Sequence, residues 1–183
     1  MLLWINGPFG GGKTQTAYVL ELALAEHRDS RSGSGSGSGR RSGSGRRVVI
    51  VPMTVVEPRY FEETVGRLRE RGHDVRHFAL LADRRTVLRR LRERRFGHAV
   101  RVVSGKDAPL RRESFAVTKL DLCLERLREP QFAEQVWTDH LTVPQVADHI
   151  AAASGLTLAP NTDSALTGRL RRAWTGVKHI RRD

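Results

Sequence analysis

The sequence predicts an α/β protein in which a parallel sheet is covered by helices on both faces. Three observations predict this class. Short apolar runs rich in β-branched residues alternate with longer segments of helical periodicity. The glycine-rich stretch 7–14 joins the first such run to the first helical segment. A length of 183 residues with 39% hydrophobic content suffices for one core, so we expect a single main domain at 1–165.

Residues 7–14 match the phosphate-binding pattern G-x-x-x-x-G-K-S/T. They follow an apolar run at 2–5 that predicts a buried strand, and they precede a segment at 15–27 that predicts a helix without Pro or Gly. In this setting the backbone N–H groups of the loop face phosphate oxygens. The sequence therefore predicts a nucleoside triphosphate site of the P-loop type, and a glycine-rich turn that matches by chance is the alternative.

The side chains of this loop have expected roles. Lys13 supplies a positive charge to the β and γ phosphates, which makes it a predicted catalytic residue, and Thr14 offers its hydroxyl to Mg²⁺. The predicted nucleotide-binding residues of the loop are Gly7, Pro8, Phe9, Gly10, Gly11, Gly12, Lys13, Thr14 and Gln15.

Composition bounds the partners and the compartment. A net charge of +12 suits nucleic acid or an anionic membrane, but only four of the 32 basic residues are Lys, a skew that genome composition also produces. Because no RNA-stacking motif, zinc spacing or helix-turn-helix pattern occurs, we expect no nucleic-acid partner. Cys123 is the single cysteine, which suits a reducing compartment, and we expect it to be a core residue. The longest apolar run, 48–56, is too short to span a bilayer, so we expect a cytoplasmic protein without a signal peptide.

Residues 30–47 alternate Ser and Gly and contain the pair Arg40 and Arg41. Without apolar side chains this stretch has nothing to bury against the entropy of ordering, so we expect a flexible linker. An engineered replacement and a natural low-complexity expansion both fit this composition.

The middle of the chain predicts two strands and two helices. A β-branched run at 48–54 predicts a buried strand that closes at Pro52. Residues 57–72 predict a helix with Pro58 in its first turn and Gly72 as its stop. The next strand is expected at 75–81. Asp83 then precedes a helix whose apolar residues, expected to face the sheet, are Val87, Leu88 and Leu91.

The third quarter of the chain begins with an aperiodic stretch at 97–110, which we expect to be mobile and a candidate lid. Residues 112–128 predict a helix, and 132–137 predict the last strand. Thr142 is expected to cap a final helix that ends at Gly155, with Pro144 in its first turn and Gln145 three positions after the cap. The apolar side of the helix at 112–128 is predicted to comprise Phe115, Leu120, Leu122, Leu124 and Leu127.

The segment 166–183 predicts a basic amphipathic C-terminal helix, because apolar residues including Trp174 recur at helical spacing with Arg and Lys mostly off that stripe. Such a helix can lie on an anionic membrane surface. Docking on the protein's own core or on a second copy is the alternative.

Five motifs occur in the order found in tunicamycin resistance proteins. They are W-I-N-G at 4–7, G-K-T-Q-T at 12–16, I-V-P-M-T at 50–54, H-F-A-L at 77–80, and T-D at 138–139 leading into V-A-D-H-I at 146–150. The chain thus resembles that family over most of its length outside 28–47 and 97–110. The resemblance implies an ATP-binding, kinase-like protein that protects bacteria against a nucleoside antibiotic and associates peripherally with the inner face of the membrane.

One departure from that family concerns its acceptor side. The family places a further strand, a helix and acidic residues between the phosphate-loop helix and the strand that ends in Val-Pro-Met-Thr, and nothing here matches them. The resemblance therefore implies that the sheet lacks an edge strand and the site its usual general base. Glu57, just after that strand, is the alternative base.

Arginines near the site follow a pattern of small P-loop kinases. Arg90 and Arg94 stand four apart on one helix, where they could reach phosphates and the base. The resemblance makes Arg90 a predicted catalytic residue and Arg94 a predicted nucleotide-binding residue. Arg111 and Arg112 are candidate lid residues. Thr138 is expected to contact the adenine, with a simple strand-to-helix turn as the alternative.

Three functions remain open at this point. The first is ATP-dependent phosphorylation or sequestration of tunicamycin, with ATP and Mg²⁺ as cofactors. The second is a small-molecule kinase with another acceptor. The third is a chain that binds nucleotide without turnover because its acceptor segment is missing.

Overall fold

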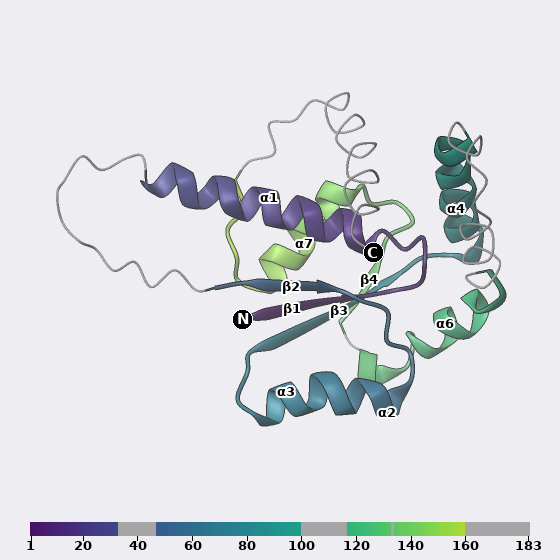
Figure 1. Cartoon of the computed structure of the whole chain (residues 1–183), viewed down its shortest axis with the longest axis horizontal. Coiled ribbons are helices and arrows are strands. Elements are labelled where there is room, and N and C mark those ends of the chain that lie inside the picture. The colour runs from purple at the N-terminus through teal and green to yellow at the C-terminus, as the bar shows by residue number, and fades with distance from the viewer. Residues whose placement is uncertain (33–46, 100–116, 133, 160–183) are drawn as a thin grey trace.

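Four parallel strands form the central sheet of the computed structural model, in the order β2-β1-β3-β4 (Figure 1). The structure describes residues 1–32, 47–99, 117–132 and 134–159. Within these ranges the strands are β1 (Leu2–Asn6), β2 (Val49–Pro52), β3 (Val75–Leu81) and β4 (Gln135–Trp137). In register, Leu2 of β1 lies opposite Val49 on one side and Val75 on the other. The predicted α/β class with a parallel sheet is confirmed.

Helices cover both faces of this sheet (Figure 1). One face carries α1 (Lys13–Ser32) and α7 (Val143–Ala153). The other carries a continuous helical segment of α2 (Pro58–Phe61), a π-helical turn (Glu62–Gly66) and α3 (Arg67–Glu70), together with α6 (Leu120–Arg126). The sheet side chains alternate accordingly, because Leu3 and Ile5 enter the core under α1 and α7 while Trp4 enters the opposite core. Three layers result.

Local signals fixed several boundaries correctly. Strand β3 spans the expected residues. The helical segment after β2 begins at the N-cap Glu57, with Pro58 first, and is stopped at Gly72, whose φ is +79°. Thr142 caps α7 with the predicted capping box: it accepts from the backbone N–H of Gln145, whose side chain accepts from the Thr142 N–H.

Strand β2 differs from its prediction because it is an edge strand and is not buried. Val49 is 55% exposed, and β1 is the neighbour with which β2 pairs. The N–H groups of Val49 and Met53 donate to the carbonyls of Met1 and Ile5, on the side of β1, at 3.1 and 3.2 Å. Because this orientation alternates along a strand, the nitrogen of Pro52 points away from β1, where no hydrogen bond is lost.

Several helix and strand predictions also need correction. Helix α1 begins at Lys13 and continues to Ser32, so it includes the first residues of the expected linker. Residues 130–132 form a 3-10 turn, and β4 begins only at Gln135. Leu122 is 44% exposed because the buried face of α6 follows the spacing of Leu120, Cys123, Leu124 and Leu127.

Helix α4 (Arg84–Ala99) stands beyond the carboxyl ends of the strands (Figure 1). Val87 and Leu91 were expected to face the sheet, but they form a separate small core with Leu120 and Leu124 of α6. The start of the expected lid, 97–99, belongs to α4. The rest of that stretch, Arg111, Arg112, linker residues 33–46 and the C-terminal segment 166–183 lie outside the described residues.

Candidate functional site: a glycine-rich loop at the carboxyl end of the sheet

The loop of residues 7–12 connects the carboxyl end of β1 to the first turn of α1, as the motif predicts. Gly10 and Gly12 have φ values of +80° and +90°, a region that L side chains rarely adopt. The N–H of Gly11 donates to the carbonyl of Pro8 at 3.0 Å, which closes a tight turn. The loop therefore ends at the amino end of a 20-residue helix, whose first turn and dipole favour an anion.

The ammonium group of Lys13 lies against this loop. Its Nζ donates to the carbonyls of Gly7 and Pro8, both at 2.9 Å, and lies 5.6 Å from the centre of the Phe9 ring. The positive charge is thus held beside the backbone that the motif assigns to phosphate. Phe9 itself is 54% exposed, so its ring is also accessible to a ligand.

The next two residues of α1, Thr14 and Gln15, are exposed, whereas Thr16 is buried. A hydroxyl that is open to solvent in the first turn of the helix, next to Lys13, fits the magnesium-binding role that the motif gives to Thr14. In the described ranges no group of three or more His, Cys, Asp or Glu side chains gathers in a metal-binding arrangement.

Helix α4 packs directly on this glycine-rich loop, which we call the phosphate loop after its sequence motif. A Cβ atom placed on Gly10 would come within 3.0 Å of Leu91 Cγ and 3.3 Å of Val87 Cγ1. The apolar side of α4 thereby fixes the distance between this helix and the loop, which sequence periodicity alone did not indicate. The same helix carries Arg90 toward the end of β4. The side chain of Arg94 lies outside the described residues.

Arg90 and Thr138, predicted separately, are in contact. The guanidinium donates to Thr138 Oγ1 at 3.0 Å and to its carbonyl at 2.7 Å, while the Thr138 hydroxyl donates to the carbonyl of Leu81 at 3.0 Å. Burial lowers the pKa of Arg90 from its usual value, although nearby Asp139 acts in the opposite direction. Arg90 therefore ties α4 to the carboxyl end of the sheet.

Asp139 completes this junction by accepting from the backbone N–H of Asp83, at 3.0 and 3.1 Å to its two oxygens. Partial burial alone would raise the pKa of Asp139. The hydrogen bonds from Thr86 and Asp83, with the charges of Arg90 and His140, outweigh burial and hold that pKa below its usual value. The carboxylate is thus stabilised in its charged form.

The segment that follows β2 also reaches the phosphate loop. Thr54 Oγ1 donates to the carbonyl of Gly7 at 2.7 Å. Glu57, the alternative general base, is the exposed N-cap residue of α2, and its side chain makes no capping hydrogen bond. Glu57 therefore follows Thr54, which contacts the loop directly, by three residues in the sequence.

Three polar residues near the loop were missed by sequence reasoning: Asn6, Thr54 and His77. Asn6 and His77 are 0% and 3% exposed. The available signal was a polar residue inside an otherwise apolar strand, since such a residue needs hydrogen-bond partners once buried. Cys123, in contrast, is a buried core residue as predicted, and burial raises its pKa to about 11 despite the lowering effect of Lys13.

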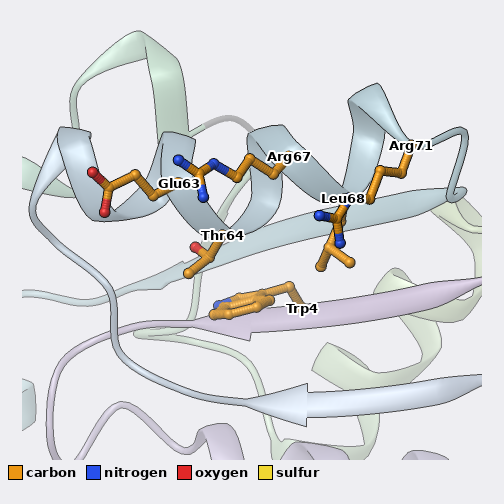
Figure 2. A pocket seen from close by; sticks show the side chains of 6 residues that line it. All are labelled: Trp4, Glu63, Thr64, Arg67, Leu68 and Arg71. Atoms are coloured by element: carbon orange, nitrogen blue, oxygen red, sulfur yellow. The ribbon is translucent and has the colours of Figure 1, made fainter.

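A cavity of about 360 Å³ lies on the opposite flank, between α3 and the strands (Figure 2). The indole of Trp4 forms its floor and donates to the carbonyl of Met53 at 3.3 Å. This cavity is distinct from the phosphate loop, because its other lining residues all come from the helical segment: Glu63, Thr64, Arg67, Leu68 and Arg71.

Comparison with known proteins gives one informative likeness. The chain is similar to the solved structure of the tunicamycin resistance protein of Deinococcus radiodurans, with 30% sequence identity and a TM-score of 0.57. The alignment covers 87% of this chain and 98% of that one. No protein-family model matches the chain, and no curated protein matches it. Separately, none of the helices in the described part of the chain is both long and apolar enough to cross a membrane.

Proposed function

Because this chain belongs to the family of tunicamycin resistance proteins, we propose that it binds ATP with Mg²⁺ at residues 7–14 and protects a cell against tunicamycin. The observation that carries the nucleotide part is the position of Lys13. Its ammonium lies against a loop with positive φ at Gly10 and Gly12, at the amino end of α1. The positive charge of Lys13, the first turn of α1 and the helix dipole together support an anion site here.

In the bound state we expect Lys13 to exchange its carbonyl partners for phosphate oxygens, since a charged acceptor makes the stronger hydrogen bond. Mg²⁺ would take the Thr14 hydroxyl and phosphate oxygens as ligands, and would neutralise charge as it develops on the phosphates. Thr138 and Arg90 lie together at the carboxyl end of the sheet, and this is where we place the base of the nucleotide.

For the protective step we propose phosphoryl transfer to the antibiotic, with sequestration as the alternative outcome. Glu57 supports transfer because its carboxylate is exposed and follows the segment that contacts the loop through Thr54. A positioned general base contributes about 10² to 10⁴ in rate, so its replacement by Gln gives a large signal. Sequestration requires no base and would be insensitive to that change.

Two measurements test this proposal. Calorimetric titration with ATP and Mg²⁺ should show saturable binding, and omission of Mg²⁺ should weaken it. A phosphoryl-transfer assay with and without tunicamycin then separates the outcomes. Antibiotic-dependent transfer that falls in Glu57→Gln supports the kinase, whereas protection of cells without transfer supports sequestration. Absence of ATP binding by the intact chain would refute the nucleotide part.

We also propose peripheral membrane association through the basic segment 166–182, from its sequence pattern alone. Truncation before Leu166 should abolish cosedimentation with anionic vesicles, and high salt should weaken binding of the intact chain by screening Arg and Lys. The matched control is the intact chain with neutral vesicles. Equal binding by the truncated protein would rule this segment out as the anchor.

A further inference from the structure

Asn6, the last residue of β1, joins two segments that are distant in sequence. Its Oδ1 accepts from the N–H of Gly7 at 2.8 Å and from the N–H of Val55 at 3.0 Å. Its Nδ2 donates to the carbonyl of Val55 at 2.6 Å. The phosphate loop begins at Gly7, and Val55 lies between Thr54 and Glu57. One fully buried amide therefore connects the phosphate loop to the segment that leads to the candidate base.

The bonding pattern fixes the orientation of this amide. A reversed amide would place its NH₂ group against the two N–H groups of Gly7 and Val55, and its oxygen against the carbonyl of Val55. Nδ2 is therefore the atom that lies 3.2 Å from His77 Nε2. Because Nδ2 can only donate, Nε2 must be the acceptor, which places the ring hydrogen of a neutral His77 on Nδ1.

His77 is itself held in place by aromatic neighbours. The Phe61 ring meets it edge-on with centroids 4.7 Å apart, and the centroid of Phe132 lies 6.2 Å away. Phe61 belongs to α2, which follows the Val55 segment. The ring of His77, which accepts from Asn6, thus packs against the helical segment that begins at Pro58. Asn6 also holds Val55, which leads into that segment.

Both peptide groups around Gly7 are held by side chains as a result. Asn6 accepts from its N–H, and Thr54 donates to its carbonyl at 2.7 Å. Gly7 has little room to move, since a Cβ atom there would come within 3.0 Å of the carbonyl of Leu80. The start of the phosphate loop is therefore a fixed point, and Asn6 is the side chain common to both sides of the junction.

We propose that Asn6 is a positioning residue of the phosphate site, which sets the placement of the loop relative to the Glu57 segment without touching nucleotide. This role rests on the proposed nucleotide function. Replacement by Ala removes four direct hydrogen bonds. Replacement by Asp keeps the two accepted bonds but places a carboxylate oxygen against the Val55 carbonyl. This variant therefore tests whether the bonds that Asn6 donates are needed.

The first test uses the unmodified protein. Nitrogen-15 spectroscopy should find His77 Nε2 unprotonated, and hydrogen exchange should find the amide of Gly7 protected to within about tenfold of Ile5 in the preceding strand β1. A protonated Nε2, or a Gly7 amide that exchanges like an exposed loop, would overturn the proposal. Neither readout depends on nucleotide, so both decide the role of Asn6 in holding the loop even if ATP does not bind.

The second test compares Asn6→Ala and Asn6→Asp with Ile150→Ala, a buried change in α7. Both Asn6 variants should speed exchange at Val55 and weaken binding of ATP with Mg²⁺ at least tenfold. Ile150→Ala should lower the melting temperature without either effect. If the Asn6 variants bind ATP as tightly as this control at matched stability, Asn6 has only a structural role. If the unmodified protein does not bind ATP, the proposed function fails separately.

Discussion

The guanidinium of Arg90 donates to both oxygens of Thr138, at 3.0 Å to the hydroxyl and 2.7 Å to the carbonyl. This contact joins α4, the helix that packs on the phosphate loop, to the residue that follows β4. Arg90, which the sequence predicts to act on phosphate, thus also has a structural contact with Thr138. The structural role predicts a loss of stability when Arg90 is replaced.

Arg90→Ala should lower the free energy of unfolding by about 1–2 kcal/mol, because it removes two hydrogen bonds from a charged donor at a half-buried position. Arg90→Lys should recover only part of this, since an ammonium cannot reproduce the planar two-point contact. Urea unfolding measures both changes. Arg89→Ala is the matched control on an exposed face of the same helix. An equal loss of unfolding free energy in that variant would show that the contact with Thr138 does not account for the effect.

Lys13→Ala should weaken ATP binding at least tenfold, or about 1.4 kcal/mol, because the charge opposite the β and γ phosphates is lost. Calorimetric titration gives the affinity. Lys119→Ala removes the same charge from an exposed position at the start of α6 and should leave binding unchanged. Equal affinities for the Lys13 variant and the unmodified protein would mean that residues 7–14 do not hold the phosphates.

Gly10→Ala should destabilise the protein more than Gly72→Ala. Both glycines have φ near +80°, so both substitutions incur backbone strain of about 1–2 kcal/mol. Only at Gly10 would the new Cβ also meet Leu91, whereas the space around Gly72 is open. The difference between the two variants in chemical denaturation therefore measures how tightly α4 packs on the loop, and identical losses would show that this packing is loose.

The stabilisation that Asp139 provides should disappear in acid. Its pKa is below the usual value near 3.8 in the folded protein, so the folded state favours the charged form, and the benefit is complete only above that value. It is lost as the pH falls through the folded pKa. The difference in unfolding free energy between the unmodified protein and Asp139→Asn should thus be constant near neutral pH and shrink below about pH 4. A difference that grows in acid would reverse this assignment.

The sequence predicted the glycine-rich turn between β1 and α1 and the bounds of β3 well, because their signals are local. Glycine spacing needs no distant partner, and β3 is a mostly apolar segment between Asp74 and Asp83. Position in the sheet is not local: β2 is richer in β-branched residues than β3, which predicts burial, and only the strand order makes it an edge. Likewise, the residues against which Val87 and Leu91 pack depend on the position of α6 in the fold.

The candidate site shows the same division. Lys13 and Thr14 follow from the motif, and Arg90 and Thr138 were each singled out, but the contact between Arg90 and Thr138 joins residues 48 positions apart in the sequence. Asn6 entered the sequence analysis only as part of the W-I-N-G motif and was not predicted as a site residue, because a single polar residue in a strand has no periodicity. The role we propose for it emerges only from its contacts with Val55, which follows β2, and with His77, which lies within β3.

The free side of β2 has a consequence for how this architecture can change. β2 pairs with β1, and Pro52 has no N–H to offer a further strand, so a segment inserted ahead of Val49 would meet the sheet at its edge. We expect an insertion there to leave the order of the strands beside the glycine-rich loop unchanged. That edge is therefore a suitable place to graft a reporter sequence.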